Sequence, residues 1–497
     1  MNRRRTATSL SVAGLAALLV LAGACSPATS TSSAGGSSST ATSRAPEPGR
    51  AGSTATSNGS SAGSGTTPSS TVEGAQANPG PSPTDAWAWT QLTDKGTEIR
   101  VATPEATCPD VKVTKAAKTT AERMEQVSKP TPPHAATSMC RLKLEDGAAE
   151  AVVDSKTPVK PSAKVPIPAW RKEGSTASGP ARIVVIGDTG CRTVQQGTSQ
   201  DCKNQWPFQP VADSAAATKP DLVIHTGDYI YRSDPQVSPV TGCDTKDDHT
   251  WGCLVADFFH PASALLAEAP IVMVRGNHET CARSGKIWFR YQATELRSDD
   301  SCSDYSDPVS IRAGKLGLVL FDSSFADEEG QKVDQEQVKK YEPQFKAVNE
   351  TLAKESPESL FLTHQPLWAV TSAGQTEVSS ANRTLDTATG SKLDEHLKLV
   401  LSGHVHLYQR IDFAPASKRQ PQVVVGSSGT ELDSAVDDAK VVGKKVDGEE
   451  VASSKTLSEF GYAVLRDSSG SWVLDYYGRN GQSLDKPCTL KGTTLSC

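Results

Sequence analysis

The stretch Ile183-Val184-Val185-Ile186-Gly187-Asp188-Thr189-Gly190 places four apolar residues directly before a polar turn. A short continuous apolar run of this kind is typical of a strand that is buried on both faces. Similar runs follow at residues 222–224, 271–274, 316–321, 360–362, 399–401 and 423–425. Helical spacing lies between them at residues 211–217 and 338–352, and we expect Pro343 to divide the second segment into two helices. This alternation of strand and helix signals predicts an α/β domain.

Polar side chains gather at the carboxyl ends of five of these runs, at residues 187–190, 227–231, 276–279, 363–364 and 403–406. Taken singly, an Asp after a strand is more often a helix cap or a turn residue. Taken together, the five groups supply Asp188, Asp228, Tyr231, Asn277, His364, His404 and His406 at strand ends, and His278 is a fourth His. Because ligands of α/β sheets bind beyond the carboxyl ends of the strands, the five groups predict one shared site.

In order along the chain, these groups read Gly-Asp-x-Gly, Gly-Asp-x-x-Tyr, Gly-Asn-His-Glu, Phe-x-x-His and Gly-His-x-His. The set resembles the motifs of the purple acid phosphatase branch of the calcineurin-like metallophosphoesterases, over roughly residues 180–480. Only the Val of the family's Val-x-x-His motif is changed, to Phe361. The resemblance implies an α/β fold of the metallophosphoesterase type, in which a β-sheet sandwich is flanked by helices.

The resemblance also implies a site for two metal ions. In this scheme Asp188, Tyr231 and His406 hold one ion, Asn277, His364 and His404 hold the other, and Asp228 bridges the two. A tyrosinate in place of an imidazole adds negative charge at the first ion, which favours Fe³⁺ there, with Fe, Zn or Mn as its partner. Two such ions about 3.5–4 Å apart clamp a phosphate and activate a hydroxide that attacks phosphorus.

His278 holds no metal in this scheme. By the resemblance it contacts the phosphate, as Asn277 does, and protonates the leaving group. The alternative is a hydrogen bond to Glu279 or to another carboxylate. The implied activity is the hydrolysis of phosphoric monoesters at the cell surface. Two other functions stay open: hydrolysis of phosphodiesters or nucleotides at the same site, and a surface binding protein without catalysis.

Charge and hydropathy exclude other classes of protein. The chain has 51 Lys and Arg against 57 Asp and Glu, a net charge of −6. This balance argues against nucleic acid as a partner, because phosphate backbones are bound by basic surfaces. No run of about 18 apolar residues lies beyond the first 25, which excludes a polytopic membrane protein. The expected partner is a small phosphate ester.

The amino-terminal residues resemble the export signal of a bacterial lipoprotein. Three Arg precede an apolar stretch at residues 10–21 and the sequence Ala22-Gly23-Ala24-Cys25, which predicts a signal peptide at residues 1–24 and a lipid on Cys25. The alternative is an ordinary signal peptide with an incidental Cys. Residues 25–85 are predicted to be a disordered tether, because 51 of the 60 residues after Cys25 are Ser, Thr, Ala, Gly or Pro. We therefore expect an exported protein, lipid-anchored on the extracytoplasmic face of the cell membrane or secreted.

The cysteines support an oxidising compartment. Ten Cys remain besides Cys25, and pairing neighbours in order would join residues 108–140, 191–202, 243–253, 281–302 and 488–497. Spacing alone leaves the connectivity open. Period-2 alternation and Pro-rich punctuation predict a small β domain at residues 86–175, followed by the catalytic domain at residues 176–497. Within the catalytic domain, residues 369–385 and 433–458 are expected to be loops that shape substrate choice.

Overall fold

A computed structural model describes residues 85–172, 174–234, 239–240, 242–243, 249–326, 332–373, 377–390, 392–417 and 419–497. The predicted signal peptide at residues 1–24, Cys25 and all but the last residue of the tether at 25–85 lie outside the described residues. No helix in the described part of the chain is long and apolar enough to cross a bilayer.

The larger sheet has a parallel centre, in which β9, β10, β11 and β1 run the same way. The predicted run 183–186 lies in β9, which is buried along its length after its first residue. The strands follow one another across the sheet as β25 (Thr494–Ser496), β24 (Cys488–Lys491), β23 (Trp472–Gly478), β22 (Gly461–Asp467), β9 (Arg182–Ile186), β10 (Leu222–His225), β11 (Ile271–Met273), β1 (Ala86–Thr93), β2 (Gly96–Thr103), β6 (Ser138–Lys143) and β5 (Glu125–Ser128), and β8 (Val159–Lys160) pairs with β1.

The smaller sheet also has a parallel centre, formed by β13, β14, β17 and β19. Its strands follow one another as β12 (Val309–Ala313), β13 (Leu316–Phe321), β14 (Glu358–Thr363), β17 (Leu397–Ser402), β19 (Gln422–Val425), β18 (Tyr408–Phe413), β21 (Glu449–Leu457) and β20 (Lys445–Val446). All seven apolar runs predicted as strands are thus confirmed as strands of the two sheets.

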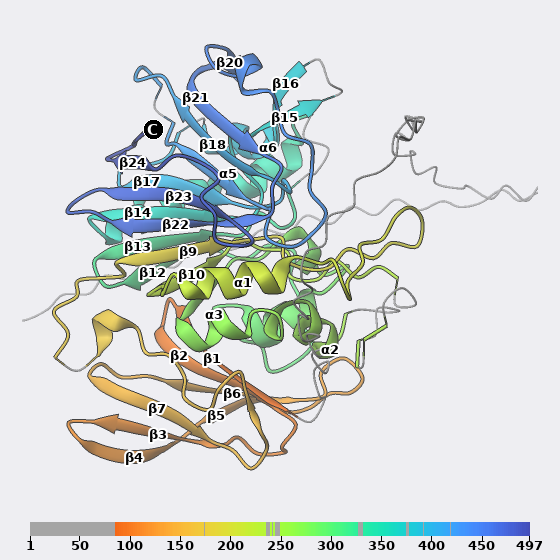
Figure 1. The fold of residues 1–497 in the computed structure, drawn as a ribbon, viewed down its shortest axis with the longest axis vertical. Coiled ribbons are helices and arrows are strands. Elements are labelled where there is room, and N and C mark those ends of the chain that lie inside the picture. The colour runs from red at the N-terminus through yellow and green to blue at the C-terminus, as the bar shows by residue number, and fades with distance from the viewer. Residues whose placement is uncertain are drawn as a thin grey trace, which may run out of the picture. The chain divides into compact units, whose positions relative to one another are not determined.

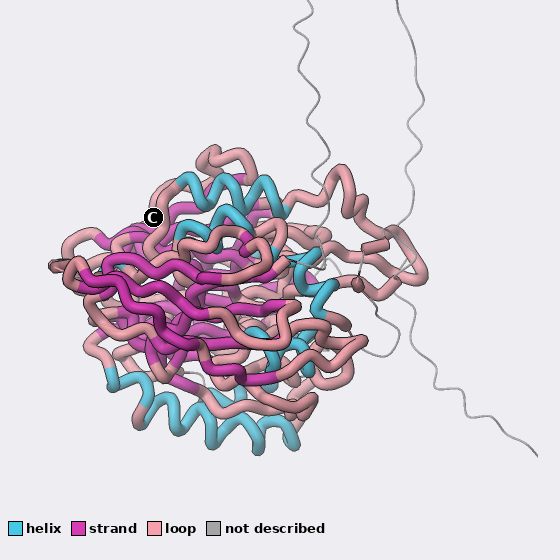
Figure 2. The backbone as a smooth tube through the Cα atoms, turned by 90° about the horizontal axis from the view of Figure 1, so that it is seen from below, coloured by secondary structure: helices cyan, strands magenta, loops and turns pink. Residues whose placement is uncertain are grey.

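The two sheets form a sandwich that is flanked by helices (Figure 1). One apolar core lies between the sheets, with Ile183 and Ile224 from one sheet and Leu362 and Leu401 from the other. Figure 2 shows the strands gathered between helices on two sides. The helices are α1 (Phe208–Ala217), α2 (Trp251–Leu254), α3 (Ser263–Glu268), α4 (Gly285–Ile287), α5 (Gln335–Glu350) and α6 (Arg383–Thr389). Residues of α1 and α3 pack on the larger sheet, and residues of α5 and α6 on the smaller one, which confirms the predicted fold class.

Two local predictions are wrong. Residues 338–352 do not form two helices, because α5 continues through Pro343 to Glu350. Its residues Tyr341 and Phe345 are buried against the smaller sheet, and this packing outweighs the hydrogen bond that Pro343 removes. Residues 369–385 and 433–458 are not simply loops. The first holds a hairpin of β15 (Val370–Ala373) and β16 (Glu377–Ser380) and the start of α6, and the second holds all of β20 and β21.

The region after residue 85 is rich in strands, as predicted. Its first strand, β1, is buried on both faces and pairs in parallel with β11 through Gln91 and Ile271, so this strand belongs to the larger sheet. A separate small sheet follows, in the order β4 (Lys118–Arg123), β3 (Asp110–Lys115) and β7 (Ala148–Asp154). The predicted domain boundary at residue 175 stays a prediction. The pairing of β1 with β11 joins residues 86–175 and the region after residue 175 in one sheet.

The five disulfides join the cysteine pairs that neighbour one another in sequence. The bonds are Cys108–Cys140, Cys191–Cys202, Cys243–Cys253, Cys281–Cys302 and Cys488–Cys497, which confirms the pairing in order. Five disulfides are typical of proteins outside the reducing cytosol. The bond Cys281–Cys302 begins two residues after the Gly-Asn-His-Glu motif and ties down the chain that follows it.

Candidate metal centre

Five loops meet where parallel strands of both sheets end. Three of them follow β9, β10 and β11 of the larger sheet, and two follow β14 and β17 of the smaller sheet. The loop after β17 touches the loop after β9, because the backbone N–H of His404 donates to both carboxylate oxygens of Asp188, at 3.1 and 3.0 Å. The sandwich therefore brings residues that are distant in sequence into one site.

The first group of site residues surrounds the Tyr231 hydroxyl. This oxygen lies 2.9 Å from Asp188 Oδ1, 2.6 Å from Asp228 Oδ2 and 3.0 Å from His406 Nε2. The carboxylates of Asp188 and Asp228 are buried, whereas the side chain of His406 is 21% exposed. The group thus runs from the buried floor of the site toward solvent.

The second group surrounds the side-chain oxygen of Asn277. His364 Nε2 lies 2.8 Å and His404 Nδ1 lies 3.1 Å from this oxygen. His364 Nε2 is also 3.4 Å from Asp228 Oδ1, so Asp228 lies between the two groups. All seven residues that the resemblance implied as metal ligands therefore come together, in the same two sets with Asp228 shared.

The backbone at these residues is strained. Asp188, Asp228 and His404 have φ values of 53°, 60° and 69°, in the left-handed region that side chains other than glycine disfavour. Gly276 leaves space for one of the carboxylates, because a Cβ on this residue would lie 2.1 Å from Asp228 Oδ1. The left-handed backbone and the space at Gly276 fix the positions of the Asp188 and Asp228 carboxylates.

Burial and neighbouring charges shift the pKa values of the site residues in opposite directions. Burial raises the pKa of Asp188 well above its usual range. Burial also opposes ionisation of Asp228, but the neighbouring His364 outweighs it and holds the pKa of Asp228 well below its usual range. Burial lowers the pKa of His364, but the neighbouring Asp228 raises it by more, so that the net pKa of His364 is about 10. Within the described residues, no Lys or Arg side chain pairs with either carboxylate.

These residues fit metal ions. Donor atoms of Asp188, Asp228 and His364 lie within 4.8 Å of one another, and all three side chains are buried. Carboxylate, phenol, amide and imidazole donors suit first-row transition metals. Cations would also offset the repulsion between two buried carboxylates that pair with no Lys or Arg among the described residues.

His278 lies beside the two groups without joining either. Its backbone N–H donates to Asp228 Oδ1 at 2.8 Å, and its Nδ1 lies 2.9 Å from the carbonyl oxygen of Ile230. A proton on Nδ1 therefore leaves Nε2 free, 3.9 Å from Asp228 Oδ2, on a side chain that is 19% exposed. Its ring also packs on Tyr231, with 3.9 Å between the ring centroids. The alternative partner Glu279 does not bond this ring in the structure, and burial lowers the pKa of His278 to about 3.

Glu279 is a residue whose role sequence reasoning missed. Its buried carboxylate accepts hydrogen bonds from the backbone N–H groups of Gly276, Asp228 and Tyr229, at 3.0, 3.1 and 3.0 Å. It thereby ties the loop after β10 to the loop after β11 and supports the strained backbone of Asp228. The position of Glu279 at the end of the Gly-Asn-His-Glu motif indicated that it lies near the site. The backbone groups that it binds are known only from the fold.

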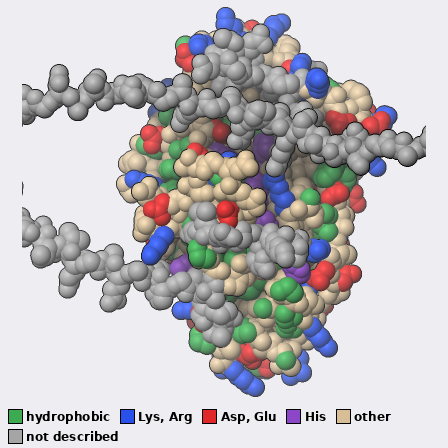
Figure 3. All heavy atoms as spheres, turned by 90° about the vertical axis from the view of Figure 1, so that its right-hand side faces the viewer, with side chains coloured by type: hydrophobic (Ala, Val, Ile, Leu, Met, Phe, Trp, Pro, Cys, Tyr) green, Lys and Arg blue, Asp and Glu red, His purple; other side chains and the backbone are tan. Residues whose placement is uncertain are grey.

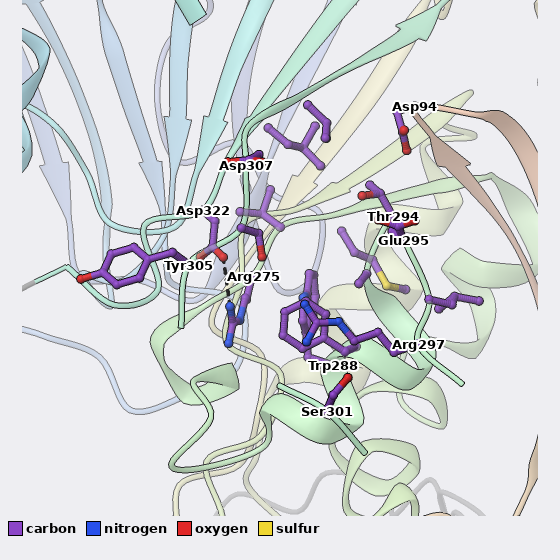
Figure 4. Close-up of a pocket in the computed structure, with 18 of the residues that line it drawn as sticks. Asp94, Arg275, Trp288, Thr294, Glu295, Arg297, Ser301, Tyr305, Asp307 and Asp322 are labelled. Carbon is purple, nitrogen blue, oxygen red and sulfur yellow. Dashed lines mark hydrogen bonds and ion pairs between the residues drawn. The ribbon is translucent and has the colours of Figure 1, made fainter. Parts of the chain in front are cut away.

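Arg275 supports the same loop from behind. Its guanidinium donates to the carbonyl oxygens of Glu279 and Ser303, at 2.9 and 2.8 Å, and to Asp322 at 3.0 Å. Figure 4 shows the Arg275–Asp322 pair in the wall of a cavity of about 640 Å³. None of the seven donor residues lines this cavity. Arg275 thus connects the wall of the cavity to the loop that carries Asn277 and His278.

Replacing Arg275 with Met should lower the free energy of unfolding by about 3–5 kcal/mol, because it leaves the buried carboxylate of Asp322 without its cationic partner. The two side chains are only 2% and 8% exposed, so solvent screens the pair little. Chemical denaturation measures the change. The double variant Arg275→Met/Asp322→Leu is the control, and it should regain part of the loss. A single variant as stable as the natural protein would show that the pair does not support this loop.

The comparisons with known proteins bear on the domain that carries this site. Residues 181–408 match the model of the calcineurin-like phosphoesterase family. The structure is similar to purple acid phosphatase PPD1 from yellow lupin seeds (Lupinus luteus), with 14% sequence identity, coverage of 80% of this chain and 73% of that chain, and a TM-score of 0.49. It is also similar to PhoD, with 13% identity, coverage of 82% and 90%, and a TM-score of 0.49. No curated protein matches the chain by sequence.

The matched residues 181–408 contain all five polar loops, from Asp188 in the first to His406 in the last. The fold, the motif order and the family model therefore agree. Residues 181–408 carry a calcineurin-like phosphoesterase domain, and the chain is a metal-dependent hydrolase of phosphoric esters.

Proposed function

We propose that this protein is a dinuclear phosphomonoesterase of the purple acid phosphatase type that acts at the cell surface. The observation that carries the proposal is the convergence of seven donor side chains into two sets that share Asp228. One ion is assigned to Asp188, Tyr231, His406 and Asp228, and the other to Asn277, His364, His404 and Asp228. When bound, such a pair supplies Lewis-acid charge that offsets the negative charge developing on the phosphoryl oxygens.

The residues of the chain position the reaction. Strained backbone at Asp188 and Asp228 fixes the two carboxylates before substrate binds, so they need no reorganisation. The Nδ1–H bond to Ile230 fixes the ring of His278 and directs its Nε2 toward the site. From there Nε2 contacts the phosphate, whose negative charge favours the protonated ring, and this proton passes to the leaving oxygen. Asn277 places its amide beside the same phosphate.

Substrate choice is tested with two related esters. We expect the metal-loaded protein to hydrolyse a nitrophenyl monophosphate with a higher kcat/KM than the corresponding bis(nitrophenyl) phosphate. The reverse preference would favour a phosphodiesterase or nucleotidase on the same site. No hydrolysis of either ester across pH 4–9 at full metal occupancy would favour a binding protein instead.

Tyr231 is proposed to bind Fe³⁺ as a phenolate, which would give the protein a visible absorption band. Replacing Tyr231 with Phe should remove this band. Tyr229→Phe is the matched control, because the Tyr229 hydroxyl bonds the carbonyl oxygen of Val274 and lies outside both donor sets. Absorption spectra and metal analysis check the prediction. An unchanged band in Tyr231→Phe would remove Tyr231 from the assigned ligands.

The proposed location is outside the cytoplasmic membrane, with a lipid on Cys25 and a tether that follows it. The five disulfides of the folded part support export. Mass spectrometry of the mature amino terminus tests the lipid. An unmodified Cys25 within a longer mature chain would contradict it.

A further inference from the structure

Arg283 is a cationic side chain near the proposed metal centre that has no partner. Its Nη1 is buried and has no hydrogen-bond partner, and no ion pair involves Arg283 among the residues that the structure describes. A buried donor that is left unsatisfied costs free energy, and such groups in native structures are often functional. The guanidinium is therefore available for an anion.

The fold brings Arg283 back to His278. The backbone N–H of Arg283 donates to the carbonyl oxygen of Thr280 at 2.9 Å, which closes a turn directly after the motif. The next residue, Ser284, donates from its N–H and its hydroxyl to the carbonyl oxygen of His278, at 3.2 and 2.7 Å. The disulfide at Cys281 restrains this turn. Arg283 is thus held on a short, braced loop whose other end is the proposed phosphate contact.

The loop of Arg283 lies against the phosphate contact His278, so a cation on this loop lies near the site. On the face drawn in Figure 3, His side chains lie in a hollow, and a Lys or Arg side chain lies close to them. A phosphate that approaches the carboxylates Asp188 and Asp228 meets repulsion that a nearby guanidinium reduces.

We propose that Arg283 binds the non-bridging oxygens of the substrate phosphate and selects monoesters over diesters. The proposal rests on the proposed function, since it names the substrate class of the same site. A planar guanidinium matches two phosphate oxygens at once, in a geometry that an ammonium group lacks. A monoester carries two negative charges near neutral pH and has three non-bridging oxygens, whereas a diester carries one charge and has two. The contact therefore favours the monoester.

The test uses the full folded chain loaded with metal, as the natural protein and as Arg283→Met, Arg283→Gln and Arg283→Lys. We expect Arg283→Met and Arg283→Gln to raise the KM for nitrophenyl phosphate about 10–100-fold, from the usual strength of hydrogen bonds to charged groups. The Kd of orthophosphate, measured by titration calorimetry, should rise by a similar factor. The KM for the bis-ester should change less than about threefold. The Arg283→Lys variant should give a nitrophenyl phosphate KM between those of the natural protein and Arg283→Met, because Lys keeps the charge but lacks the planar, two-pronged guanidinium.

Arg123→Met is the matched control, because Arg123 lies on β4 and its side chain is 89% exposed. It should leave both constants unchanged. A merely structural role for Arg283 would lower metal content and kcat for both esters, without separating the two KM values. That result, or an orthophosphate Kd within about twofold of the natural protein, would overturn the proposal.

The proposal and the proposed function fail separately. If the natural protein with bound metal hydrolyses neither ester, the proposed function fails. The calorimetric comparison with orthophosphate then still decides whether Arg283 binds the anion. Melting temperatures identify any variant that does not fold, and the remaining substitutions at the same position then carry the test.

Discussion

Replacing Asp228 with Ala should abolish metal binding and phosphate ester hydrolysis together. Asp228 is the only one of the seven residues that belongs to both donor sets, with Oδ2 2.6 Å from the Tyr231 hydroxyl and Oδ1 3.4 Å from His364 Nε2. Its loss takes a negative ligand from each ion and removes the acceptor for the His278 backbone N–H at 2.8 Å.

The measurement combines metal analysis with turnover of nitrophenyl phosphate. We expect the metal content to fall from about two ions per chain, the number that such sites hold, to less than one. Asp110→Ala is the control, because Asp110 lies on β3, its side chain is 43% exposed, and it lies outside the site. Circular dichroism reports whether each variant is folded. A folded Asp228→Ala protein with two ions and full turnover would show that Asp228 does not bridge.

Replacing His278 with Ala should spare both metal ions and reduce kcat by about 10²–10⁴, the range typical of a lost proton donor. The ring is fixed by its bond to Ile230 and by packing on Tyr231, and its Nε2 faces the site without joining the donor sets. The substitution therefore removes a proton source and a phosphate contact while the metal ligands stay in place.

Leaving groups of different basicity separate these two roles. Phenyl phosphate has a poorer leaving group than nitrophenyl phosphate, so it depends more on protonation and should lose more activity in His278→Ala. An equal loss for both esters would assign His278 to phosphate binding alone. Loss of metal from the folded variant would show that His278 supports a metal ligand instead.

The sequence predicted the strands and the polar side chains that lie together at their ends, because both are local signals. An apolar run such as 183–186 favours a buried strand wherever it lies, and a polar turn after it lies at the end of that strand. The packing of the two sheets then brings the loops after β9 and β17 to the same end of the sandwich. That is why Asp188 and His404 touch, although they are distant in sequence.

The predictions that failed concern features that depend on contacts between segments distant in sequence. β21 alternates weakly between buried and exposed residues, and its strand character comes from pairing with β18 along six residue pairs. β1 is buried on both faces because it pairs with β11 in the larger sheet, and the sequence of β1 alone does not predict this pairing. The roles of Glu279, Arg275 and Arg283 likewise depend on which groups surround each side chain. Composition and spacing do not contain that information.

The central claim is that two ions lie between these seven side chains, and anomalous X-ray scattering from crystals of the metal-loaded protein tests it most directly. We predict two peaks about 3.5–4 Å apart, with Asp228 between them. One peak should lie among Asp188, Tyr231 and His406, and the other among Asn277, His364 and His404. Catalytically active crystals with no peak at this site, or with metal bound only elsewhere, would contradict the account.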